Sequence, residues 1–255
     1  MYYEYIDLVF SFYIQLYIIL MKKIAIFIPT RDRPHKINKI HKFWFELTDN
    51  TVETDCIVVL DEDNQDKYPR LPNFIYEVVP SIGIRGMTYP LNCAVKKFHQ
   101  EYQYIGFWGD DHCPKTKNWN SEMYNMLEQN KPYAMVYAND LLQRERLPTE
   151  IIMDSKFVKH IGGMVEPKLQ HMFVDDYWLC IGKNIKNIHY LNNVIIEHEH
   201  HSVNKCENDD MYKSVNTMVA RDQQTAIRIT NSNEFNKMIL NIREEILLER
   251  YSFRS

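Results

Sequence analysis

Short apolar runs separated by polar loops organise the first half of the chain. Runs rich in β-branched and aromatic residues are typical of buried strands, and segments with apolar positions at helical spacing lie between them. The pattern predicts strands at 23–28, 55–60, 74–79 and 104–108. It predicts helices at 35–47 and 91–101. This alternation predicts an α/β fold with a mostly parallel central sheet flanked by crossover helices.

The second half of the chain is less regular but continues the same alternation. Apolar runs predict these further strands: 133–137, 151–153 and 188–197. Helical spacing predicts further helices at 119–129, 154–161, 209–228 and 234–250. Another helix is expected to open at Phe173. No internal repeat or low-complexity linker interrupts the sequence, so residues 22–255 suit one α/β domain.

Residues 1–21 form an N-terminal extension of different character. The stretch 8–21 is almost wholly apolar, with two acids before it and two lysines after it. It is shorter than the roughly 20 apolar residues that cross a bilayer, and it lacks the basic start and cleavage site of a signal peptide. Three interpretations stay open: a marginal membrane anchor, a helix packed on the domain, or a leader before a true start at Met21. We favour the leader.

Composition narrows the environment of the protein. The hydrophobic fraction of 45% can build a sizeable core, and the net charge of −4 without a polybasic run does not indicate stable nucleic-acid binding. The five cysteines include no Cys-x-x-Cys pair, which favours reduced thiols in the cytoplasm over a disulfide framework. Abundant Asn, Ile, Lys and Tyr suit an A+T-rich genome, and with the small size they fit a viral or phage protein.

Acidic residues follow two of the predicted strands. Asp110 and Asp111 follow the run 104–108, and Asp61 and Asp63 follow the predicted strand 55–60. In a parallel sheet these strand ends share one edge, where α/β proteins bind ligands. Adjacent carboxylates repel each other unless a cation joins them, and oxygen ligands favour Mg²⁺ or Mn²⁺. The alternative is a polar turn after a core strand.

Three arginines belong to the same expected edge. Arg31 and Arg33 lie in the Pro-Thr-Arg-Asp-Arg-Pro loop after the first strand, and Arg85 lies in the loop after the third. A guanidinium offers two parallel donors and a permanent charge, so these side chains are candidates to clamp a diphosphate. The alternative is that they are solvated surface arginines.

A histidine cluster ends the predicted strand 188–197. His198 and His200 are two positions apart, so on a strand they share one face and could point together at a metal. Neutral imidazole suits Mn²⁺ as well as Zn²⁺. The alternative is a polar surface loop, and a zinc site is disfavoured because no cysteine pair accompanies the histidines.

Four segments together resemble the nucleotide-binding half of GT-A fold glycosyltransferases, especially family 2. In order they are IAIFIPTRDRP, DCIVVLDEDN, GIRGMTYPLNCAVKKF and YIGFWGDDH, and they cover residues 22–114. The resemblance implies a Rossmann-like fold and a nucleotide-diphosphate sugar as donor, with UDP-sugars favoured. It implies that Thr30, Arg31 and Asp61 contact the base or its loop, and Pro29 is a further candidate for donor binding. Asp110 would contact the ribose or sugar and Asp111 would bind the metal, whereas Gly109 stands where the family's Asp-x-Asp motif begins.

The same resemblance extends to residues 115–230, which would form the acceptor half before a C-terminal helix in 231–255. The family has an acidic pair that opens a helix and supplies a general base, and Asp175-Asp176 is similar to it. We favour Asp176 as the base, with Asp175 in reserve, and the alternative is helix capping. The family's C-terminal histidine implies that His198 or His200 joins Asp111 at the metal. A single ion would then require Asp111 within about 5 Å of one of them.

The resulting hypothesis is a metal-dependent glycosyltransferase, inverting through an Asp base. The acceptor would be a polysaccharide, a protein or a modified DNA base, and membrane association depends on residues 1–21. One alternative is a nucleotidyltransferase, which would carry a Gly-rich phosphate loop where this chain has Pro-Thr-Arg-Asp-Arg-Pro. Another is a relative that binds nucleotide sugars without turnover, which the glycine at position 109 suggests.

Overall fold

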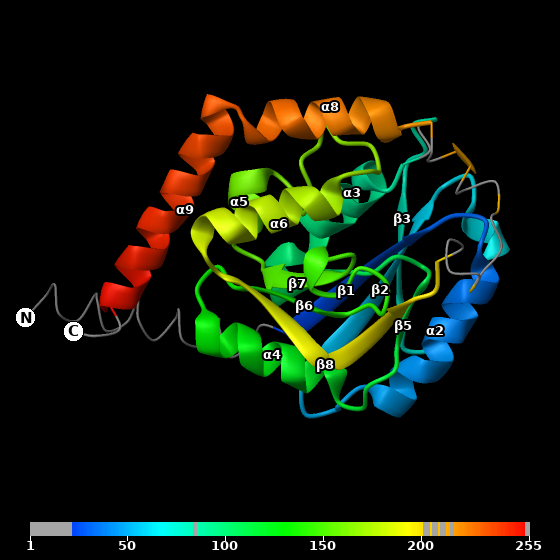
Figure 1. The fold of residues 1–255 in the computed structure, drawn as a ribbon. Helices are drawn as coiled ribbons and strands as arrows, with labels where there is room; N and C mark the ends of the chain where they lie inside the picture. Colours follow the sequence, from blue (N-terminus) through cyan, green and yellow to red (C-terminus); the bar gives the residue numbers. More distant parts are fainter. Residues whose placement is uncertain are drawn as a thin grey trace, which may run out of the picture.

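An eight-stranded sheet forms the centre of the fold (Figure 1). The computed structural model describes residues 22–83, 86–200, 205, 209, 213–214 and 217–252, and all structural statements concern these residues. In spatial order the strands are β3 (Ile75–Val79), β2 (Thr54–Asp61), β1 (Lys22–Thr30), β4 (Tyr102–Phe107), β7 (Ile151–Asp154), β6 (Met135–Asn139), β8 (Ile188–His198) and β5 (His112–Pro114).

The sheet is mixed, and its parallel part carries the strand ends identified in the sequence. Strands β3, β2, β1 and β4 are parallel neighbours, and β8 is parallel to β6. The remaining pairings are antiparallel: β4 with β7, β7 with β6, and β8 with β5. Because β2, β1 and β4 lie side by side in one direction, the loops that follow them leave the sheet at one edge. The predicted α/β class is confirmed.

Helices cover both faces of the sheet (Figure 1). One layer consists of α3 (Thr88–Phe98), α5 (Phe157–Ile161), α6 (Val174–Ile185), α8 (Val219–Thr230) and α9 (Asn233–Ser252). The other layer consists of α2 (Pro34–Leu47) and α4 (Trp119–Asn130). Each helix layer packs on its own hydrophobic core. Side chains alternate along β1, so Phe27 lies in the core under the first layer, and Ile26 and Ile28 lie in the core under the second. Short 3₁₀ turns cover Gln65–Lys67, His99–Glu101 and Arg144–Arg146.

Most predicted elements occur within a few residues of their expected bounds. The structure differs from the prediction in one additional strand and in the start of one helix. Strand β5 was not predicted, because three residues are too few to show a period. It pairs with β8 in a register that sets His112 opposite His198. The helix expected from residue 209 is described as α8 only from Val219 onward.

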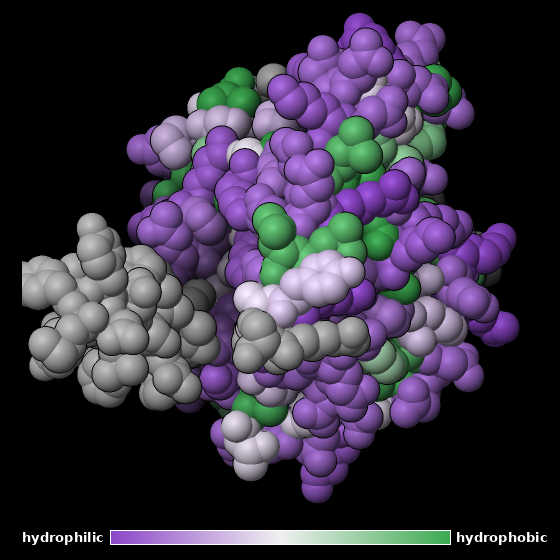
Figure 2. Space-filling view, turned by 90° about the vertical axis from the view of Figure 1, so that its left-hand side faces the viewer, coloured by the Kyte–Doolittle hydropathy of each residue, from purple (hydrophilic) through white to green (hydrophobic). Residues whose placement is uncertain are grey.

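The surface beside α9 is mostly hydrophilic, with scattered apolar groups (Figure 2). Helices α8 and α9 contribute several exposed apolar side chains, among them Ile227, Leu240, Leu247 and Leu248. Scattered exposure of this kind is ordinary for a folded domain. The apolar stretch 8–21 lies outside the described residues, and within those residues no helix is both long enough and apolar enough to cross a membrane.

Candidate active site

The loop that follows β1 is fixed to the loop that follows β2 by Arg31. Its guanidinium donates to Asp61 Oδ2 at 2.8 Å and to both carboxylate oxygens of Asp63 at 2.8 and 2.6 Å. Hydrogen bonds from Arg31 and Ser81 hold the pKa of Asp63 well below its usual range. Arg31 is therefore held between two carboxylates, at one side of the site.

Asp110 lies at the end of β4 in a buried network of opposite charges. Its Oδ2 accepts a hydrogen bond from the Thr30 hydroxyl at 2.8 Å, and its Oδ1 accepts one from Arg33 at 3.0 Å. Arg33 also donates two bonds to Asp209, at 2.7 and 2.6 Å, so this predicted phosphate ligand is engaged by two acids. Burial and the neighbouring Asp111 raise the pKa of Asp110.

Asp111 lies beside two imidazoles and forms a candidate metal centre. Its Oδ1 is 3.6 Å from Nε2 of His198 and 3.4 Å from Nδ1 of His112. One ligand atom from each of the three residues fits within 4.8 Å of the others, and the two rings stack with centroids 4.3 Å apart. The expected proximity of Asp111 and His198 is confirmed. His200 is adjacent, with its ring centroid 5.1 Å from that of His198.

A buried acid, Asp140, lies behind His198. Its Oδ2 is 3.8 Å from Nδ1 of His198, and the same carboxylate accepts hydrogen bonds from the Thr149 hydroxyl and from three consecutive backbone amides. Burial lowers the pKa of His198, but the carboxylates of Asp111 and Asp140 outweigh it and raise that pKa to about 9. At 3.8 Å the two atoms are at ion-pair distance and do not form a hydrogen bond, so Asp140 acts on His198 through its charge, while Nε2 of His198 faces Asp111.

The glycine at position 109 has a steric cause. A Cβ built there would lie 2.6 Å from Asp111 Oδ1 and 2.9 Å from His112 Nδ1. The backbone N–H of Gly109 also donates to His112 Nδ1 at 3.1 Å, and His112 Nε2 lies 3.3 Å from the Thr149 hydroxyl. A side chain at this position would therefore require the Asp111 carboxylate or the His112 imidazole to shift, so glycine suits the present arrangement of these two groups.

The two acids that open α6 point in different directions. Phe173, in the left-handed region at φ 63°, turns the chain into the helix. Asp175 lines the central cavity, whereas the side chain of Asp176 is exposed and lies outside the described cavity lining. Burial and the charge of Asp176 raise the pKa of Asp175 to about 6. Of the two candidate bases, Asp175 lines the cavity, whereas the sequence analysis favoured Asp176.

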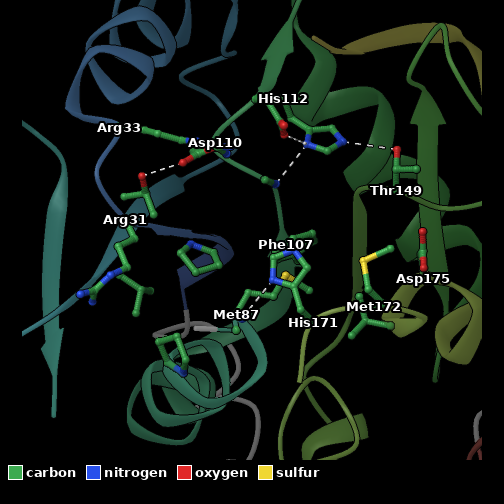
Figure 3. Close-up of a pocket in the computed structure, with 18 of the residues that line it drawn as sticks. Arg31, Arg33, Met87, Phe107, Asp110, His112, Thr149, His171, Met172 and Asp175 are labelled. Carbon is green, nitrogen blue, oxygen red and sulfur yellow. Dashed lines mark hydrogen bonds and ion pairs between the residues drawn. The ribbon is translucent and has the colours of Figure 1, made fainter. Parts of the chain in front are cut away.

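A cavity of about 340 Å³ joins these groups. Arg31 and Asp175 lie on opposite sides of it, with His112 between them at the top of Figure 3. The predicted residues that line it are Pro29, Thr30, Arg31, Arg33, Asp61, Asp110, Asp111, Asp175, His198 and His200. Asp63 contacts the site through Arg31, and Arg85 lies outside the described residues. The lining residues that sequence reasoning did not assign include His112, Thr149, His171 and Met172.

Comparisons with known proteins identify the fold. No protein-family model and no curated protein matches the sequence. A solved mannosyltransferase from Pyrobaculum calidifontis, in complex with GDP-Man and Mn²⁺, matches with a TM-score of 0.58 and 12% identity over 88% of this chain and 69% of that one. Glucosyl-3-phosphoglycerate synthase from Mycobacterium tuberculosis, in complex with Mn²⁺, UDP and glucosyl-3-phosphoglycerate, matches with a TM-score of 0.54 and 13% identity over 78% of each chain.

S. aureus TarS 1-349 in complex with UDP-GlcNAc also matches, with a TM-score of 0.51 and 15% identity over 91% of this chain and 73% of that one. These structures are GT-A glycosyltransferases, and the likeness extends over most of the chain. The predicted GT-A fold is confirmed, as a fold like that of enzymes that use nucleotide sugars. At such low identity the likeness concerns the fold alone, and the predicted viral origin stays a prediction.

Proposed function

We propose that this chain is a metal-dependent glycosyltransferase that moves a sugar from a nucleoside-diphosphate sugar to an acceptor hydroxyl. One observation carries the proposal: Asp111, His198 and Asp175 meet in one cavity at the ligand-binding edge of a GT-A sheet. Fold alone does not determine activity, so the proposal depends on this grouping of side chains.

The nucleotide end of the donor would lie beside Arg31 and Asp61. Arg31 is already fixed by two carboxylates, so it forms a rigid wall of the cavity. Thr30 and Asp110 lie next to it and would contact the ribose or the sugar. UDP-sugars and GDP-sugars both stay candidates, since the matched structures hold UDP-GlcNAc and GDP-Man.

The residues at the end of β4 fit a divalent cation. One carboxylate and two imidazoles converge there, and the Asp140 carboxylate lies behind one of the imidazoles. Nitrogen ligands favour Mn²⁺ over Mg²⁺. Asp111 and His198 would hold the ion, with His112 or His200 beside them. When bound, the ion would neutralise the diphosphate and stabilise the charge that develops on it as it leaves.

Asp175 supports the role of general base better than Asp176. An acceptor hydroxyl must lose its proton as it attacks the anomeric carbon, so the base must face the reacting atoms. Asp175 lines the cavity, and its pKa of about 6 leaves it ionised yet basic near neutral pH. Direct attack assisted by this base would invert the anomeric centre. The acceptor would be a polysaccharide, a protein or a modified DNA base.

A panel of nucleotide sugars tests the proposal. The wild-type protein is incubated with UDP-glucose, UDP-GlcNAc or GDP-mannose, with Mn²⁺ or with EDTA, and release of the nucleoside diphosphate is measured. We expect Mn²⁺-dependent release from at least one donor. Tight Mn²⁺-dependent binding without release would instead support the binding-only relative. Pyrophosphate release from a nucleoside triphosphate mixed with a sugar phosphate would support the nucleotidyltransferase.

A further inference from the structure

His171 has no role in the predictions from sequence, yet it lies in the wall of the cavity. Figure 3 places it between Arg31 on one side and Asp175 on the other, next to Phe107 and Met87. The segment that carries it leads directly into α6, so His171 and Asp175 lie four positions apart on one short stretch of chain. The ring is half-buried.

Hydrogen bonds fix both the backbone and the ring of His171. Its own N–H donates to the fully buried carboxylate of Asp222 at 2.9 Å. Its Nδ1 accepts a hydrogen bond from the N–H of Met87 at 3.3 Å, at the start of α3. The same two segments are joined again next to it, because the Thr88 N–H donates to the Gln170 carbonyl at 3.1 Å. The ring is thus positioned by two separate elements.

Gly86 shows how closely these segments approach each other. A Cβ at this position would collide with the carbonyl oxygen of Gln170. A glycine is therefore required where the start of α3 meets the loop that holds His171.

The hydrogen bond from Met87 determines which ring nitrogen of His171 carries the proton. Because Nδ1 accepts an N–H, the neutral ring must carry its proton on Nε2. Burial lowers the pKa of His171 to about 4, which keeps the ring neutral at physiological pH. Among the described residues, no hydrogen bond involves Nε2. The structure thus holds an uncharged N–H donor at the edge of the cavity.

We propose that Nε2–H of His171 donates a hydrogen bond to a hydroxyl group of the sugar that is transferred. The inference rests on the proposed function. The diphosphate would lie at Asp111 and the acceptor oxygen at Asp175, so the anomeric carbon and its sugar must lie between these two acids. His171 lines the same cavity, between Arg31 and Asp175 (Figure 3). A neutral donor suits a sugar hydroxyl, whereas the charged diphosphate is better matched by cations.

Binding measurements on four proteins test the inference: wild type, His171→Phe, His171→Gln and His189→Gln. His189 is a matched control, since its Nε2 pairs with Asn187 at the far end of β8. Titration calorimetry with Mn²⁺ gives the Kd of UDP, UDP-glucose and UDP-GlcNAc, and of GDP and GDP-mannose. We expect His171→Phe to weaken binding of the preferred nucleotide sugar roughly three- to tenfold, and binding of its nucleoside diphosphate less than twofold. His171→Gln, which retains an N–H donor, should recover most of the loss, and His189→Gln should match wild type.

Equal weakening of the sugar-free nucleotide and the nucleotide sugar by His171→Phe would overturn the inference, and so would unchanged binding of both. A loss in His171→Gln as large as in His171→Phe would also overturn it, since a donor would then have no value. These results leave the proposed function intact, because wild type still binds. If wild type binds no nucleotide at all, both the proposed function and this inference are wrong.

Discussion

The two walls of the cavity are built in different ways. The wall at the ends of β1, β2 and β4 is held by pairs of charged side chains, such as Arg31 with Asp61 and Arg33 with Asp110. The opposite wall consists of residues 170–175. It is held by the Asp222 carboxylate and the His171 ring, which accept hydrogen bonds from backbone amides. In the proposed reaction, the first wall would contact the nucleotide end of the donor, and the second would present one acid and one neutral N–H group to the reacting sugar.

This difference suggests separate contributions to affinity and to rate. Charged groups at the first wall and the metal centre should govern whether the nucleotide binds and leaves. Groups on the second wall should act mainly on the sugar and the acceptor, and so on turnover. Substitutions that affect one wall and leave the other unchanged can test the division, provided that folding is checked in each variant.

The largest effect is expected at the candidate metal centre between the walls. Asp111→Ala removes the carboxylate that both imidazoles face, so we expect Mn²⁺ affinity to fall and transfer to drop by about a thousandfold or more. Removal of Mn²⁺ by EDTA should have a similar effect on wild type. Isothermal titration with Mn²⁺ and a rate assay measure both. Asp63→Ala, on the exposed rim of the first wall, is the control, and equal losses in the two variants would contradict the assignment.

The metal centre also shows which parts of the site the sequence could predict. Asp61, Asp110 and Asp111 were found because parallel neighbouring strands bring their carboxyl ends to one edge. His112 was not assigned, because its partner His198 is set opposite it only by the three-residue strand β5. Asp140 gave no signal either, since it acts on a histidine far along the chain.

The second wall was harder to predict, for a geometric reason. Asp175 and Asp176 both open a helix, so their sequence context is nearly the same. Which one faces the cavity depends on the phase of α6, and that phase is set by the left-handed turn at Phe173. His171 and Asp222 are likewise defined by the backbone groups they bind, and backbone contacts leave little trace in residue types.

Asp175→Asn is expected to reduce kcat by about a hundredfold with little change in nucleotide affinity, since it removes the proposed base from the second wall and leaves the first intact. In wild type the rate should rise with pH through about 6 and then level off, because the base must be ionised and burial with the Asp176 charge raises its pKa to about 6. A pH–rate profile and the Kd of the nucleoside diphosphate are the measurements. Asp176→Asn is the matched control, and the larger loss in that variant would return the role to Asp176.

Asp222→Asn has the smallest expected effect on turnover, and it tests whether the second wall depends on its anchor. The carboxylate is fully buried and accepts N–H bonds from Gln170, His171 and Met172. An amide presents one acceptor oxygen in place of two, so we expect unfolding free energy to fall by about 1–3 kcal/mol and kcat by roughly tenfold. Denaturant unfolding and the rate assay measure these changes.

Nucleoside-diphosphate affinity should stay within about twofold of wild type in Asp222→Asn, because the charged pairs of the first wall do not involve this residue. Asp63→Asn supplies the reverse case, since it weakens a contact of Arg31 on the exposed rim and leaves residues 170–175 untouched. If Asp222→Asn impaired nucleotide binding as strongly as turnover, the two walls would be energetically coupled. Their different construction would then not correspond to different roles.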